Sequence, residues 1–78
     1  MELIIISPEG VVLNETTERV TLPGSRGDFS VLKDHAPLVS TLEKGQIVYF
    51  QNKKEKKFNI EGGVIVIEKN VVRVMVEK

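Results

Sequence analysis

Short runs of aliphatic and β-branched residues, each closed by a turn residue, are the feature that most limits how this chain can fold. Glycine, proline and asparagine separate runs rich in valine, isoleucine and leucine, and a period of two fits these runs better than the 3.6-residue period of a helix. We therefore predict an all-β protein with almost no helix. Strands at such close spacing favour a two-sheet sandwich or a flattened barrel. The expected strands lie near residues 2–7, 11–14, 17–22, 28–32, 38–43, 46–51, 57–61, 63–68 and 71–76.

The size of the chain predicts a single domain that depends on a partner. Its 78 residues, 41% of them hydrophobic, leave room for one domain, residues 1–78, and for no second. A domain of this length buries only about 60–65% of its unfolded surface, so we expect modest stability unless a disulfide, a metal or a partner adds to it. The chain has no cysteine and one histidine, which argues against disulfides, metal sites and cofactors. Of these three sources of added stability, a partner surface is the one that remains.

The charge balance excludes several classes of partner. Eleven basic and eleven acidic residues give zero net charge, so we expect no nucleic-acid partner and no field that draws the protein to an anionic membrane. No signal peptide and no apolar run of about 18 residues is visible, so we expect no lipid insertion, and a cytosolic or equivalent organellar location unless a partner brings the chain to a membrane. A local basic cluster is either a solvated hairpin tip or a phosphate site; its residues are Lys53, Lys54, Lys56 and Lys57.

Three strand segments are apolar on both faces, which is unusual in so small a sandwich. A two-layer sandwich buries one face of each sheet, so its strands should alternate apolar with polar residues. Residues 3–6, 47–50 and 64–67 do not alternate. Either loops cover the excess apolar surface or it is scattered, or it forms one contiguous protein-binding face. We favour the binding face, because exposed apolar patches above a few hundred Å² usually mark interaction sites.

Catalytic constellations are not apparent. His35 follows Asp34, which could orient it only in a turn, and the chain has neither a cysteine nor a G-x-S-x-G nucleophile turn to complete such a site. We expect His35 to be a contact or packing residue. The acids near turns have no spacing that fixes two carboxylates across one cleft; they are Glu9, Glu15, Glu18, Asp28 and Asp34. We therefore expect no enzymatic activity from this chain.

The glycine-containing segment of residues 24–27 predicts a displayed turn. It lacks the GK[ST] ending of a phosphate-binding loop, and no helix follows it. Its glycines suit positive φ angles, with Arg26 and Asp28 at the tip. A nucleic-acid site would need a basic groove with interleaved aromatic residues. The chain offers only Phe29, Tyr49, Phe50 and Phe58.

A motif series along most of the chain resembles the epsilon subunit of F-type ATP synthases, which is called delta in mitochondria. The run GSRGDFSVLKDHAPLVSTLEKGQI holds a G-D-F turn in register with HAPL, and F-N-I-E-G-G follows further on. The resemblance implies a flattened two-sheet β-sandwich of about ten short strands. The matching segments are residues 20–24, 27–32, 35–38, 45–47, 58–63 and 71–76.

The resemblance implies a non-catalytic central-stalk subunit that links gamma to the c subunits of the membrane rotor ring and couples proton translocation to ATP synthesis. Carried over by position, one group of residues faces the rotor ring: Arg26, Gly27, Asp28 and Phe29. A second group faces gamma: Ser7, His35, Ala36, Pro37, Leu38 and Ser40. The implied location is the cytoplasmic face of the bacterial inner membrane, as a peripheral part of the complex, or its organellar equivalent.

The chain departs from the family pattern after its last expected strand. Family members usually continue into two helices that can inhibit ATP hydrolysis and that bind ATP in some bacteria. This chain stops at Lys78, so we predict no nucleotide binding and no hydrolytic brake from this polypeptide. The alternative to a rotor subunit is a stand-alone β-sandwich adaptor or small-ligand domain that shares only the fold.

Overall fold

The computed structural model describes residues 1–77, which contain nine β-strands and no helix. The all-β prediction is confirmed. In chain order the strands are β1 (Glu2–Ser7), β2 (Gly10–Thr16), β3 (Arg19–Gly24), β4 (Gly27–Leu32), β5 (Leu38–Leu42), β6 (Gly45–Gln51), β7 (Lys54–Ile60), β8 (Gly63–Glu68) and β9 (Val71–Val76).

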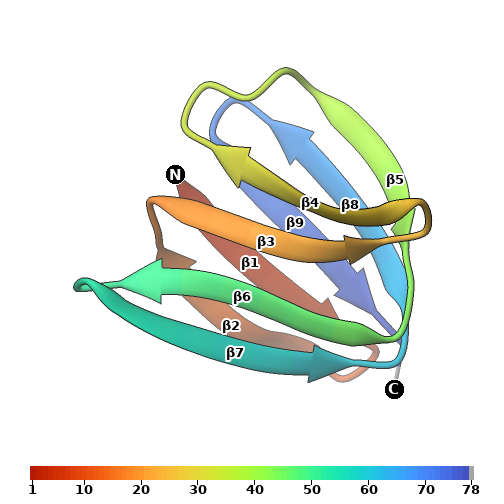
Figure 1. Cartoon of the computed structure of the whole chain (residues 1–78). Helices are drawn as coiled ribbons and strands as arrows, with labels where there is room; N and C mark the ends of the chain where they lie inside the picture. Colours follow the sequence, from red (N-terminus) through yellow and green to blue (C-terminus); the bar gives the residue numbers. More distant parts are fainter. Residues whose placement is uncertain (78) are drawn as a thin grey trace.

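The strands form one hydrogen-bonded sheet that folds over into two layers (Figure 1). We call the layer with strand order β2-β1-β9-β8-β5 sheet I, and the layer with strand order β4-β3-β6-β7 sheet II. The layers join where Gly24 of β3 pairs with Leu42 of β5. All strand pairs are antiparallel except β1 with β9, which is parallel. The predicted two-sheet sandwich is therefore the observed architecture.

The core lies between the two layers and follows the alternation of the strands. Leu3 and Ile5 of β1 are fully buried, as are Val72 and Val74 of β9, while Ile4 between the first two remains partly exposed. This alternation places every second side chain against the opposite sheet. The buried hydrophobic residues are Leu3, Ile5, Val20, Leu22, Val31, Leu42, Ile47, Tyr49, Ile60, Ile65, Ile67, Val72 and Val74.

Tight turns set the register of two hairpins. Asn52 and Lys53, between β6 and β7, have φ angles of 53° and 64°, and Lys69 and Asn70, between β8 and β9, have φ angles of 45° and 64°. Two consecutive residues with positive φ form the hairpin turn whose twist matches that of its strands, and asparagine tolerates this conformation well. The asparagines that punctuate the sequence therefore mark real turns.

Several predicted boundaries differ from the structure, and two strands begin two or three residues away from the predicted start. β7 begins at Lys54 rather than at residue 57, so only Lys53 of the basic cluster lies in the turn, and the other three lysines are exposed along an edge strand. The expected strand at residues 17–22 begins at Arg19, and Thr17 precedes it as a buried polar residue. The backbone of an edge strand pairs regardless of side-chain polarity, so the lysines do not interrupt β7.

Candidate interaction surfaces

The outward side of sheet I carries a continuous apolar surface. Ile6 of β1 lies beside Met75 of β9, which lies beside Val64 of β8. One row further along the strands, Val66 of β8 lies beside Val39 of β5. None of these side chains points into the core. We call this surface the outer face; its residues are Ile4, Ile6, Val39, Val64, Val66 and Met75.

The exposure of these side chains is high for aliphatic residues at strand positions. Val39 is 70% exposed, and Val64 and Met75 are each 36% exposed. Arg73 lies among them, paired with Ile4 on one side and with Val66 on the other. Apolar surface with a central arginine is typical of protein–protein interfaces. The sequence pattern indicated two segments of this surface but missed Val39 and Met75, which lie outside those segments.

The outward side of sheet II is mixed, because exposed Leu32 of β4 lies beside Arg19 among polar residues, and the third two-faced segment lies on this side and not on the outer face. Val48 of β6 lies between Thr21 of β3 and Lys57 of β7. The guanidinium carbon of Arg19 lies 4.5 Å from the centre of the Phe50 ring and covers it. A cation over an aromatic face is a favourable contact that also shields the ring from water. The excess apolar residues therefore form a contiguous face on one sheet only.

The β3–β4 hairpin displays part of the predicted ring-facing group. Arg26, Gly27 and Asp28 are exposed, and Gly27 has a φ of 118°, which a glycine adopts without strain. Phe29 differs from the prediction, because it is half-buried and packs against the core. Gly24 is required for another reason than a positive φ. A Cβ atom there would lie 2.7 Å from the Gly27 carbonyl oxygen and 2.8 Å from the Phe29 ring, so the glycine makes room for the turn backbone and for the aromatic side chain.

The predicted gamma-facing residues lie at two places on sheet I. Ser7 ends β1, and Ser40 lies on β5, three strands away and roughly 14 Å distant at about 4.8 Å per strand. His35, Ala36 and Pro37 form the exposed loop that leads into β5. The two groups are not adjacent, and the apolar outer face occupies the surface between them.

His35 and Asp34 do not form a catalytic pair. The Nδ1 atom of His35 donates a hydrogen bond of 2.6 Å to the carbonyl oxygen of Ala36. Asp34 instead joins the turn after β8, because its backbone N–H donates to the Asn70 side chain (2.7 Å) and its carboxylate accepts from the Asn70 amide (3.1 Å). Asp34 thus ties two loops together, and the His35 side chain is exposed.

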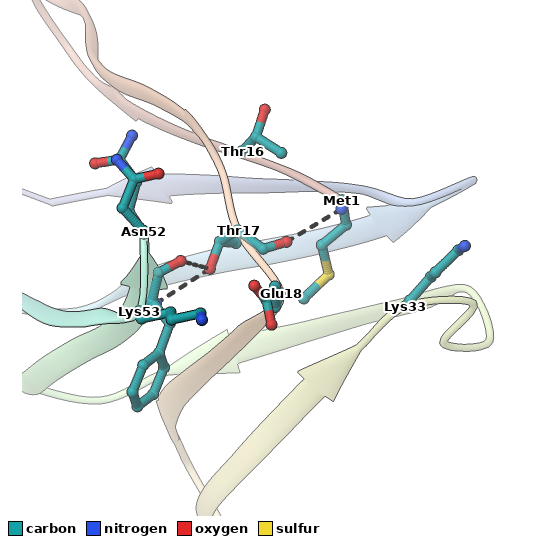
Figure 2. A pocket seen from close by; sticks show the side chains of 9 residues that line it. Met1, Thr16, Thr17, Glu18, Lys33, Asn52 and Lys53 are labelled. Carbon is teal, nitrogen blue, oxygen red and sulfur yellow. Dashed lines mark hydrogen bonds between the residues drawn. The ribbon is translucent and has the colours of Figure 1, made fainter.

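A pocket of about 590 Å³ opens beside the start of β1 (Figure 2). Thr17 lies at its centre, and the hydroxyl of Thr17 accepts a hydrogen bond from the backbone N–H of Phe50 (3.1 Å) and donates to the carbonyl of the same residue (2.5 Å). The terminal ammonium of Met1 donates to the carbonyl oxygen of Thr17 (3.1 Å). These polar groups hold the backbone together and are not free to act on a ligand. Lys33 and Lys53 also line the pocket.

Residues 1–77 contain no group of three or more histidine, cysteine, aspartate or glutamate residues placed to hold a metal ion. Nor does this part of the chain contain a helix with the length and hydropathy needed to cross a membrane. The surfaces that the structure offers are therefore the outer face, the β3–β4 hairpin and the loop around His35.

Comparison with known sequences assigns the whole chain to one family. A sequence model of the ATP synthase delta/epsilon chain β-sandwich domain matches residues 1–78. The chain is 41% identical over 75 residues to the ATP synthase epsilon chain of Desulfitobacterium hafniense, a match that covers 96% of this chain and 57% of that protein. It is 34% identical over 76 residues to the plastid ATP synthase epsilon chain of Prototheca wickerhamii, covering 97% of this chain and 57% of that protein. The chain thus spans little more than half the length of these relatives.

Comparison with solved structures supports the fold. A chain in the central stalk/c-ring structure of the Tetrahymena thermophila mitochondrial ATP synthase superposes with a TM-score of 0.82 at 16% identity, covering 100% of this chain and 63% of that one. A chain of the Euglena gracilis mitochondrial ATP synthase superposes with a TM-score of 0.88 at 22% identity, covering 95% of this chain and 48% of that one. At these identities the likeness concerns the fold.

Proposed function

The chain belongs to the ATP synthase delta/epsilon chain family, whose β-sandwich domain it matches over residues 1–78, and on that premise we propose that it is a non-catalytic part of the rotor. It links the gamma subunit to the c subunits of the membrane ring and couples proton translocation to ATP synthesis. It acts at the cytoplasmic face of the bacterial inner membrane, or at the organellar equivalent, as a peripheral part of the complex. Its role requires protein contacts rather than a cofactor or a nucleotide.

The apolar outer face is the single observation that carries this proposal. Aliphatic side chains on four neighbouring strands of sheet I are partly or largely exposed. Leaving such a surface in water is unfavourable by about 25 cal/mol for each Å² that a partner could cover. A permanent partner removes that cost. We assign the outer face to gamma, because it connects Ser7 with the segment from His35 to Ser40.

The β3–β4 hairpin is assigned to the ring. Its exposed tip, Arg26, Gly27 and Asp28, lies beside β5 and away from the β6–β7 turn (Figure 1). Asp28 offers a carboxylate to the basic or polar groups of the ring loops. Phe29 contributes indirectly, because its side chain packs against the core and holds the hairpin in place.

A binding experiment with matched variants tests the proposal. Val64→Glu places a carboxylate in the middle of the outer face, and we expect it to weaken binding to purified gamma at least tenfold. Val48→Glu is the control, because it places the same carboxylate on the outward side of sheet II beside Lys57. Calorimetry should give an unchanged affinity for the control. Equal affinity for both variants would refute the assignment of the outer face.

The wild-type chain supplies the broader test. It should co-purify with gamma and the rotor ring in stoichiometric amount on size exclusion. A chain that associates with neither would overturn the rotor proposal and favour the stand-alone adaptor or small-ligand domain.

A further inference from the structure

The edges of the two sheets are not equally protected against pairing with another strand. β2, one edge of sheet I, is irregular, since its register with β1 shifts between Ile5 and Ile6. β7, an edge of sheet II, carries three lysines and a glutamate. Bulges and charged side chains are the devices that normally block strand addition at an edge. β5, the other edge of sheet I, has the sequence LVSTL and carries neither.

Hydrogen bonds show which backbone groups of β5 point away from β8. The N–H of Glu43 donates to the carbonyl of Pro23 (2.8 Å), and the hydroxyl of Ser25 donates to the carbonyl of Thr41 (3.3 Å). Both partners lie on the side of β5 opposite β8. Because strand residues alternate in direction, Val39 has the same orientation as Thr41. The N–H and C=O of Val39 therefore point to this open side, where no strand of residues 1–77 pairs with it.

A groove runs along this open side of β5. It has a volume of about 640 Å³, with one wall formed by Val39, Ser40 and Thr41 and the other by the β3–β4 hairpin from Gly24 to Phe29. The side chains of Ser25 and Thr41 join the two walls at one end through a contact of 2.7 Å between their hydroxyl oxygens. The groove is therefore bridged at one end and lies beside an unpaired strand edge.

We infer that this groove binds an extended segment of the gamma subunit, which adds a strand to sheet I along β5. The inference rests on the proposed function, since it specifies how gamma engages the His35–Ser40 region. Backbone N–H and C=O groups that point into a groove are matched best by another extended backbone. The segment places a small or apolar side chain over Val39 and polar groups toward Arg26 and Asp28. Gamma is the occupant because the groove continues directly into the outer face through Val39, whose side chain belongs to that face.

A pair of substitutions at one position separates backbone from side-chain recognition. Val39→Pro removes the N–H that points into the groove and leaves the pairing of β5 with β8 intact, because that pairing uses the neighbouring residues. Val39→Ala is the control, since it trims the side chain and keeps the N–H. The thermal unfolding midpoints of the two free variants should agree to within a few degrees. This agreement verifies that the proline variant folds.

Binding of each variant to purified gamma and amide hydrogen exchange of the wild type give the readouts. We expect Val39→Pro to raise the Kd at least tenfold above that of Val39→Ala, and the Val39 amide to exchange quickly in the free protein and slowly in the complex. Equal Kd values for the two variants, or a Val39 amide that remains fast in the complex, would overturn strand addition while gamma binding itself stands. Failure of the wild type to bind gamma would overturn the proposed function instead. Concentration-dependent dimerisation that protects Val39 without gamma would make a second copy the occupant and would also overturn the inference.

Discussion

Thr17→Val should destabilise this protein far more than the loss of one hydroxyl on the surface. Thr17 is 3% exposed and lies where β3 has not yet begun, opposite the end of β6. Its hydroxyl accepts from the Phe50 N–H at 3.1 Å and lies 2.5 Å from the Phe50 carbonyl and 3.0 Å from the Arg19 carbonyl. The hydroxyl thus substitutes for a neighbouring strand. Valine has nearly the same shape but leaves both Phe50 groups without this partner.

The expected cost follows from those two Phe50 groups. A buried donor or acceptor without a partner costs about 1–3 kcal/mol, and partial access of water to this site lowers the total to about 2–3 kcal/mol. The whole domain of 78 residues should have a free energy of unfolding of only about 4–12 kcal/mol. With an unfolding entropy of about 2.1 cal/mol/K per residue, the loss lowers the midpoint of thermal unfolding by about 12–18 °C.

Urea denaturation followed by circular dichroism measures the effect against two controls. Thr17→Ser keeps the hydroxyl and should cost about 1 kcal/mol for the missing methyl group. Thr21→Val removes a hydroxyl whose 2.8 Å contact with Ser30 is exposed, and it should cost less than about 0.5 kcal/mol. The m value should stay constant, because the folded state remains equally compact. A Thr17→Val protein within 0.5 kcal/mol of the wild type, or a serine variant as unstable as the valine variant, would refute the reasoning.

Three further outcomes are expected. Burial, and secondarily the charge of Glu15, raises the pKa of the Tyr49 hydroxyl above its usual value of about 10, so its stabilising contribution is complete below that pH and is lost as pH rises further; a pH series of urea midpoints should show this alkaline decline in the wild type and not in Tyr49→Phe. Gly63→Ala should cost about 3 kcal/mol or more, because the new Cβ would lie within van der Waals overlap of the Met75 carbonyl oxygen; Gly27→Ala has open space around the new atom but a φ of 118° that alanine rarely adopts, so it should cost about 1–3 kcal/mol, and a Gly63→Ala protein at least as stable as Gly27→Ala would contradict this. Asp28→Lys should partly weaken proton-coupled ATP synthesis in reconstituted vesicles, by no more than about 1 kcal/mol of binding, and unchanged coupling would count against a ring contact at Asp28.

The strands themselves could be predicted because their cause is local. Runs of β-branched residues broken by turn residues locate each strand to within three residues of its observed bounds. The largest error, at the start of β7, arose where lysines replace aliphatic residues on an edge strand. The pattern of apolar side chains indicates which strands are buried. The backbone of β7 pairs with β6 from Lys54 onward even though that pattern is absent there.

The arrangement of the strands could not be predicted from pattern alone. β1 pairs in parallel with β9 from the far end of the chain, and that pairing places Ile6 beside Met75. The apolar excess of residues 3–6 and 64–67 therefore falls on one sheet, while that of residues 47–50 falls on the other. Thr17 was missed for a similar reason, since its partner Phe50 lies 33 residues away in the sequence. Pairings over such distances depend on the whole core and leave no periodic signal.

The candidate site was predictable where a backbone constraint has a sequence signature. The hairpin tip was found because Gly27 adopts a positive φ. Phe29, by contrast, was placed at the tip by its position in a motif, and the structure turns its ring inward, which explains why residue 24 is a glycine. A motif match thus fixes which residues belong together but not which way each side chain points.

β5 is the element on which both proposed contacts with gamma depend. The Val39 side chain belongs to the outer face, while its backbone groups belong to the groove. One partner that covers the face and fills the groove would therefore fix the sandwich in both position and rotation, because side-chain packing alone permits sliding whereas strand pairing defines a register. The hairpin that we assign to the ring forms the opposite wall of the same groove, so a strand seated there would lie between the proposed gamma contact and the proposed ring contact.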